Sequence, residues 1–204
     1  VTYRKVYNLY FCDYFMVEPI EVGVGKYERT ENPDEYLITE GLDSCIGLGL
    51  VGLKNGIQKR GLAHIFYDGN LKDGGLAKLS EEDALRIKSD VDGILKDWNG
   101  YENIKSFIIA NRFEKAKVSE NDVPKHTNPG FNYVTDLIKE KFIDLKLYED
   151  IEWKDESLPE SLGGNKLVHI HWKDVVLHKD KINIMYKDDS DKWLNSKNFS
   201  HPLD

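Results

Sequence analysis

The chain has few cysteines, no long apolar run and a shortage of basic residues. Its 204 residues include only Cys12 and Cys45, too few for a disulfide framework, although one bridge between them stays possible. No apolar run reaches about 18 residues, so we expect no membrane insertion. There are 28 Lys+Arg against 36 Asp+Glu. That balance disfavours nucleic acid as the partner, because phosphate binding requires a clustered basic surface.

What is present is enough for one sizeable core. Hydrophobic residues make up 40% of the chain, and neither an internal repeat nor a low-complexity linker divides it. We therefore predict a single domain over residues 1–187. Residues 188–204 are polar with isolated aromatics, and we expect them to form a loosely packed tail.

Short apolar segments between turn signals predict strands in the first third of the chain. Tyr36–Thr39 is one such segment, and Ile46–Leu53 is another, in which glycines alternate with large aliphatic residues. That alternation is typical of a strand with another backbone packed close to one face. Lys54-Asn55-Gly56 is a hairpin turn signal, and Lys59–Tyr67 then returns as an apolar strand.

Two helices are predicted farther along. Ser80 is a helix N-cap followed by an acidic first turn, apolar residues recur at helical spacing as far as Trp98, and Gly100 ends the helix. Asn128-Pro129 opens the second helix. Further strands are predicted at Lys105–Asn111, Leu145–Trp153, Leu167–Trp172, Asp174–His178 and Lys181–Tyr186. Together these elements indicate an α+β fold with a layered, sandwich-like β-sheet core flanked by two amphipathic helices.

Cys45 and His64 form a candidate thiol site. Cys45 stands on a glycine-punctuated turn that opens an apolar strand, and His64 lies nineteen residues later in the next apolar run. The thiolate is the nucleophilic form of cysteine, and a nearby imidazole lowers the thiol pKa. The hairpin brings the two side chains within reach if the register is suitable. Cys12 lies in an aromatic stretch without an adjacent base, so we expect it to be structural.

A longer pattern around these residues resembles a known family. Thr39-Glu40-Gly41-Leu42-Asp43-Ser44-Cys45-Ile46-Gly47, followed by Gly61-Leu62-Ala63-His64, is similar to the CheD family of chemoreceptor glutamine deamidases. That family shares its Thr/Cys/His site with the catalytic domain of cytotoxic necrotizing factor and with Burkholderia lethal factor. The resemblance covers about residues 22–67, including Val22-Gly23-Val24-Gly25. It implies that Cys45 is the nucleophile, His64 the base and Thr39 the residue that orients His64.

The resemblance also implies a reaction and a partner. The thiolate of Cys45 would attack a glutamine side-chain amide, ammonia would leave, and water would hydrolyse the thioester to glutamate. We expect backbone N–H groups around Ser44 and Cys45 to stabilise the oxyanion, and no metal or cofactor to be needed. The expected partner is a protein with an exposed glutamine. It is a chemoreceptor if the enzyme is cytoplasmic, or a host protein if it is a secreted toxin.

Two alternatives stay open. Asp43 stands where the family usually has glycine, and a carboxylate there raises a thiol pKa by like-charge repulsion or changes the turn. The chain would then be a catalytically silent binding module of the same fold. The second alternative is a metal site, because His169 and His171 lie at strand spacing, with Asp174 and His178 close behind. The oligomeric state, and the choice between hydrolysis and transamidation, are not decided by the sequence.

Overall fold

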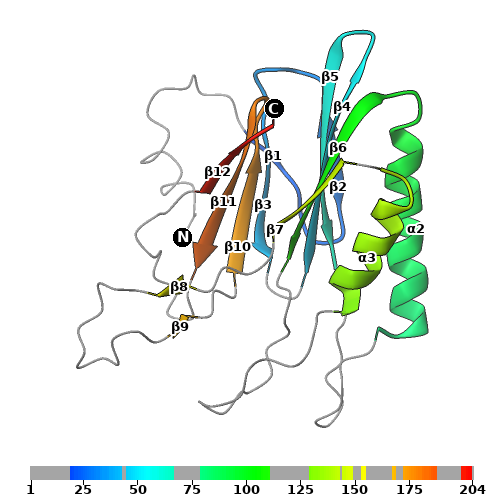
Figure 1. Ribbon diagram of the computed structural model, residues 1–204, viewed down its shortest axis with the longest axis vertical. Coiled ribbons are helices and arrows are strands. Elements are labelled where there is room, and N and C mark those ends of the chain that lie inside the picture. The colour runs from blue at the N-terminus through cyan, green and yellow to red at the C-terminus, as the bar shows by residue number, and fades with distance from the viewer. Residues whose placement is uncertain are drawn as a thin grey trace.

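The computed structural model describes residues 19–42, 45–66, 79–110, 129–142, 144–148, 153–154, 167–168, 172–187 and 199–203. These residues form two five-stranded sheets and two helices (Figure 1). The two sheets face each other, and both helices lie on the side of one sheet that is turned away from the other. The predicted α+β fold with a layered sheet core is therefore confirmed.

Sheet A contains the strand that carries Thr39. Its strand order is β1-β3-β10-β11-β12, in which β1 runs parallel to β3 and the remaining neighbours are antiparallel. The strands are β1 (Ile20–Glu21), β3 (Leu37–Leu42), β10 (Trp172–Leu177), β11 (Lys181–Lys187) and β12 (Phe199–Pro202).

Sheet B contains the strand that carries His64. Its order is β2-β5-β4-β6-β7, antiparallel except for the parallel pair β6 and β7. The strands are β2 (Tyr27–Thr30), β4 (Ile46–Lys54), β5 (Ile57–Ile65), β6 (Glu102–Ala110) and β7 (Asp144–Tyr148). Two further short strands, β8 (Trp153–Lys154) and β9 (Leu167–Val168), pair only with each other in the described part of the chain.

The β4–β5 hairpin forms where the turn signal predicted it. Asn55 and Gly56 have φ values of 53° and 76°, the left-handed conformation that a two-residue type I′ turn requires at both positions. The turn fixes an antiparallel register of nine residue pairs from Ile46 opposite Ile65 to Lys54 opposite Ile57. This register positions the candidate site, because β5 carries its histidine and its cysteine directly precedes β4.

The helices cover the outer face of sheet B. The first, α2 (Glu81–Asp97), begins after Ser80, whose hydroxyl accepts from the N–H of Asp83 at 3.0 Å, as the predicted cap requires. The second is α3 (Pro129–Lys139). Apolar residues of both helices pack against one face of β4, β5 and β6, and the other face of these strands packs against sheet A. None of the described helices is long and apolar enough to cross a membrane.

The end of the chain differs from the predicted loose tail. Residues 199–202 pair with β11 as the edge strand β12, and Leu203 is buried. The Leu203 N–H donates to the Asp180 carbonyl at 2.8 Å, and the Lys105 ammonium donates to the Leu203 carbonyl. The sequence offered only isolated apolar residues here, because the partners that bury them are distant in the chain.

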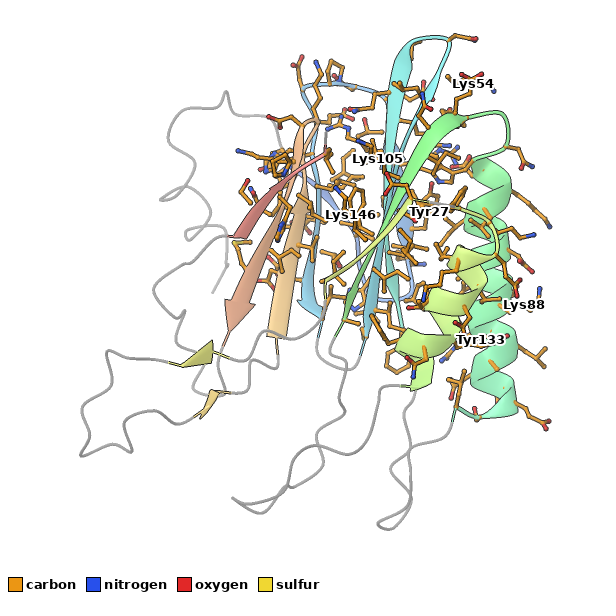
Figure 2. All side chains as sticks on the ribbon, in the orientation of Figure 1. Tyr27, Lys54, Lys88, Lys105, Tyr133 and Lys146 are labelled. Carbon is orange, nitrogen blue, oxygen red and sulfur yellow. The ribbon has the colours of Figure 1, made fainter. Side chains whose placement is uncertain are left out.

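A buried lysine of β5, Lys59, connects sheet B to α2 through an ion pair and a hydrogen bond with Asp97. Lys59 is 3% exposed and donates to the Asp97 carboxylate at 2.6 Å and to the Asp97 carbonyl at 2.8 Å. Its ammonium also lies 4.9 Å from the ring centre of Trp98 and 4.6 Å from that of Tyr101. Tyr27, labelled in Figure 2, donates its hydroxyl to the same carboxylate at 3.0 Å.

We expect Asp97→Ala to destabilise the fold by about 3 kcal/mol, because it leaves the buried Lys59 charge without its carboxylate. This value is at the lower end of the losses that follow removal of one partner from a buried ion pair, because the Asp97 carbonyl still accepts from Lys59. Urea unfolding measures the change. Asp92→Ala is the matched control, because it breaks the exposed Lys88–Asp92 pair on the same helix, and exposed ion pairs contribute little to stability. Equal losses in the two variants would contradict this prediction.

Candidate active site

Thr39 and His64 come from different sheets and meet in the space between them. Each side chain is 1% exposed, and Thr39 Oγ1 lies 2.8 Å from His64 Nδ1. The two residues are twenty-five positions apart in the chain. The structure therefore brings together two of the three residues that the sequence pattern selected.

The hydrogen bonds around Thr39 determine the tautomer of His64. The Thr39 hydroxyl donates to the Val22 carbonyl at 2.8 Å, because a carbonyl oxygen can only accept. A hydroxyl has one proton, so Thr39 Oγ1 accepts from Nδ1–H of the imidazole. His64 Nε2 consequently carries the lone pair. This atom is buried and has no hydrogen-bond partner among the residues that the structure describes.

One short segment holds both members of the pair. After β1 the chain leaves sheet A at Val22, whose carbonyl accepts from Thr39, and turns through Gly25 into sheet B. The Gly25 N–H donates to the His64 carbonyl at 2.8 Å, and the His64 N–H donates to the Lys26 carbonyl at 2.9 Å. The glycine-rich start of the sequence pattern thus fixes the backbone of His64 and supplies the acceptor for Thr39.

Burial lowers the pKa of His64 below its ordinary value of about 6.5. The imidazole is therefore neutral near pH 7 and able to accept a proton at Nε2. Thr39 carries no charge that would raise this pKa. In this respect the pair differs from a histidine oriented by a carboxylate, which would stabilise the imidazolium more strongly.

Cys45 lies on the same face of sheet B as His64. It is 7% exposed, precedes the first residue of β4, and packs in the apolar core between the sheets. Gly47 is directly opposite His64 in the β4–β5 register, and Cys45 stands two residues before Gly47, where a one-residue extension of β4 would make it the diagonal neighbour of His64. Such neighbours are about 7–8 Å apart at Cα, a distance that two inward-facing side chains can span.

Gly47, opposite His64, leaves room for the side chain of Leu42 from the neighbouring sheet. A Cβ atom at this position would lie 2.8 Å from Cδ1 of Leu42, closer than carbon atoms pack. The glycines in this strand were predicted to face a second backbone, but the atoms that come closest to Gly47 and Gly49 belong to the side chains of Leu42 and Phe107. Leu42 is the last residue of β3.

No protein-family model and no curated protein matches the chain. The functional interpretation therefore depends on the residues of the site itself. Two residues that bear on it, Asp43 and Ser44, lie outside the described part of the chain. The oxyanion role predicted for the backbone around Ser44 and the effect predicted for Asp43 remain predictions.

Two members of the alternative metal cluster lie within the described residues. The Asp174 carboxylate accepts from the Gly41 N–H at 2.9 Å, and the His178 ring stacks on Tyr36 with 5.4 Å between centres. His169 and His171 fall outside the described ranges. Within those ranges, no three His, Cys, Asp or Glu side chains converge as a metal site would require.

His178 gives the fold a dependence on pH. Burial, with a smaller effect from the nearby Lys181 charge, lowers its pKa to about 4. Between this value and the unfolded pKa of about 6.5, the unfolded chain binds a proton that the native protein excludes, so stability should rise with pH. We expect His178→Gln to flatten this rise, as measured by urea unfolding at several pH values. An unchanged slope would contradict the assignment.

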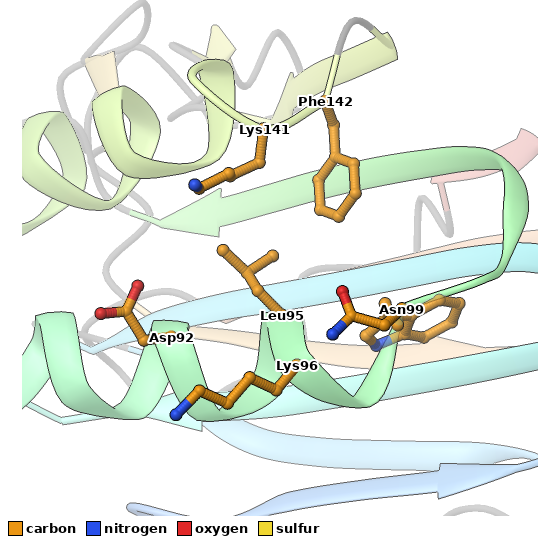
Figure 3. Close-up of a pocket in the computed structure, with 7 residues that line it drawn as sticks. Asp92, Leu95, Lys96, Asn99, Lys141 and Phe142 are labelled. Atoms are coloured by element: carbon orange, nitrogen blue, oxygen red, sulfur yellow. The ribbon is translucent and has the colours of Figure 1, made fainter.

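A shallow groove of about 380 Å³ lies in the helix layer and not at the Cys45 site (Figure 3). Leu95 of α2 and Phe142, just after α3, point toward each other across it, and Asp92 and Lys141 lie at one end. The helices cover the face of sheet B opposite to the one that carries His64. The groove is therefore separated from the candidate site by a full sheet.

Proposed function

We propose that the protein is a cysteine-dependent glutamine deamidase that acts on protein substrates. The observation that carries this proposal is the oriented imidazole of His64. The Val22–Thr39–His64 hydrogen bonds hold its basic nitrogen, Nε2, without a partner in the described structure, on the sheet face that also carries Cys45. A histidine kept neutral and fixed in one tautomer is suited to general-base catalysis.

The proposed reaction is acyl transfer through a thioester. His64 Nε2 takes the Cys45 proton, and the thiolate attacks the carbon of the glutamine side-chain amide. The carbon–nitrogen bond then breaks, and the nitrogen leaves as ammonia with the proton held by His64. His64 next takes a proton from water, whose oxygen attacks the thioester carbon. The carbon–sulfur bond then breaks, and His64 returns the proton to the Cys45 thiolate, which leaves glutamate as product. Thr39 keeps Nδ1 protonated throughout, so Nε2 remains the atom that exchanges protons.

Burial of Cys45 and His64 also favours a second candidate, a binding module that keeps the fold without turnover. Thiol alkylation separates the two. An active site should let a small neutral reagent modify Cys45 near neutral pH faster than an ordinary thiol, and modification should abolish turnover. A silent module should leave Cys45 inert. Loss of activity to a chelator instead of an alkylating reagent would favour the metal alternative.

Incubation with candidate partner proteins tests the proposal directly. Mass spectrometry should find a glutamine converted to glutamate in an intact partner, with release of ammonia, and no such change after Cys45 is alkylated. Added amines distinguish the two outcomes of the thioester, because transamidation would couple them to the glutamine. Turnover of free glutamine equal to that of any intact protein would redirect the assignment to a small-molecule amidase.

We expect kcat/KM on the true partner to fall as salt is raised. The net charge of −8 favours a partner with a basic patch beside its glutamine, and such steering is screened over about 8 Å at physiological ionic strength. Alkylation of Cys45 by a neutral reagent is the control, because it has no charge to screen and should barely change. Equal salt effects on the two reactions would exclude steering by charge.

A further inference from the structure

The strand that carries Thr39 is interrupted by a bulge two residues after it. Val175 pairs with Thr39, and Lys173 pairs with Leu42, so Glu40 and Gly41 together oppose the single residue between Val175 and Lys173. Gly41 has a φ of 72°, the left-handed conformation that glycine adopts in one class of bulge. The bulge is therefore built into the sequence at Gly41.

This bulge sets which side chains of β3 face the candidate site. In a regular strand Leu37 and Thr39 would share a face, and Leu42 would point to the opposite one. The extra residue in the bulge shifts the alternation of side chains by one position, so that Leu42 points to the same face as Leu37 and Thr39. Leu37 and Leu42 both lie in the core between the sheets, where Thr39 contacts His64, and Leu42 occupies the space beside Gly47.

Asp174 holds the bulge in place. Its carboxylate accepts from the Gly41 N–H at 2.9 Å, and the side chain is 1% exposed. Because Asp174 alternates with Val175, whose side chain lies between the sheets, it belongs to the other face of sheet A. Gly41 is half-buried, and a charged acceptor such as this carboxylate makes a stronger hydrogen bond to its N–H than a neutral one would.

We propose that Asp174 is a positioning residue for the deamidase site, which acts through the Gly41 bulge to aim Thr39 at His64. The inference rests on the proposed function and deepens it. Asp174 lies on the face of sheet A opposite to the one where Thr39 contacts His64, so the role is one of positioning and not of catalysis. Asp174 positions Thr39 through the backbone of β3, which contains both Thr39 and Gly41 and leads on toward Cys45.

The experiment compares Asp174→Ala with Asp174→Asn, whose amide oxygen can still accept from Gly41. Asp180→Ala is the matched control, an exposed aspartate in the turn that joins β10 to β11. We expect Asp174→Ala to lower kcat by up to ~100-fold with little change in KM, because a small misplacement of a catalytic group has that effect. Asp174→Asn should retain most of the activity, and Asp180→Ala all of it.

Two further measurements report on the geometry itself. Nitrogen NMR of the His64 ring should show Nδ1–H in the wild type and a mixture of tautomers in Asp174→Ala. The pH profile of Cys45 alkylation should shift in that variant toward the ordinary thiol pKa of about 8.5. The tautomer can be measured whether or not the protein deamidates anything, so failure of the proposed function and failure of this inference are distinguishable.

The outcomes decide the assignment. Wild-type turnover, tautomer and alkylation profile in Asp174→Ala would overturn it. Should that variant fail to fold, Asp174→Ser, whose hydroxyl reaches less far than a carboxylate, makes the same comparison. Failure of both variants to fold would assign Asp174 to stability alone and overturn the positioning role. If kcat fell in Asp174→Ala while the tautomer of His64 stayed unchanged, Asp174 would not act by positioning Thr39.

Discussion

Replacing Cys45 with serine should abolish deamidation and leave the protein folded. A serine hydroxyl is far less acidic than a thiol, and His64, whose pKa burial lowers, is too weak a base to activate it. Loss of the nucleophile from a catalytic unit costs roughly 10⁴-fold or more in kcat. The change in volume is small, so the apolar core around residue 45 should tolerate it. Ammonia release and mass spectrometry of the substrate measure the first effect, and thermal unfolding measures the second.

Cys12→Ser is the matched control for this experiment. Cys12 lies outside the described residues, and the sequence around it predicts a structural thiol without an adjacent base. That variant should keep its turnover and its sensitivity to alkylation. Deamidation retained by Cys45→Ser, or lost in a folded Cys12→Ser, would refute Cys45 as the nucleophile.

Replacing His64 with alanine should lower kcat by ~10²–10⁴-fold, the usual contribution of a general base. Thr39→Val should cost less. It keeps the shape of the side chain and removes the acceptor of Nδ1–H, so Nε2 is no longer held as the basic nitrogen. Rates measured with saturating substrate separate these effects from changes in binding, and added zinc should restore neither variant.

The pH profile offers a second test of His64. The acid limb of kcat/KM should fall below pH ~6.5, because burial lowers the pKa of this imidazole and protonation removes its function as a base. His64→Ala should lose that limb. If His171→Ala or His178→Ala lowered activity more than His64→Ala, we would replace the thiol site by the metal site as the functional interpretation.

Local signals in the sequence predicted the elements that depend on a few neighbouring residues. Ser80 and the acidic turn after it marked the start of α2, and Asn55-Gly56 marked the hairpin. β12 was missed because its pairing with β11 is decided by residues elsewhere in the chain. The role of Asp174 was missed for a similar reason. Gly41 within an apolar run was an available sign of a bulge, but nothing near it indicated which side chain would hold it.

The sequence predicted which residues compose the candidate site, because Thr39, Cys45 and His64 stand in a pattern that resembles the CheD family. How Thr39 and His64 meet became visible only in the folded protein. Thr39 and His64 lie in different sheets, and Val22, the bulge at Gly41 and the carboxylate of Asp174 arrange their contact. Strand pairing, and the face of the sheet to which each side chain points, follow from long-range hydrogen bonds that local sequence patterns do not specify.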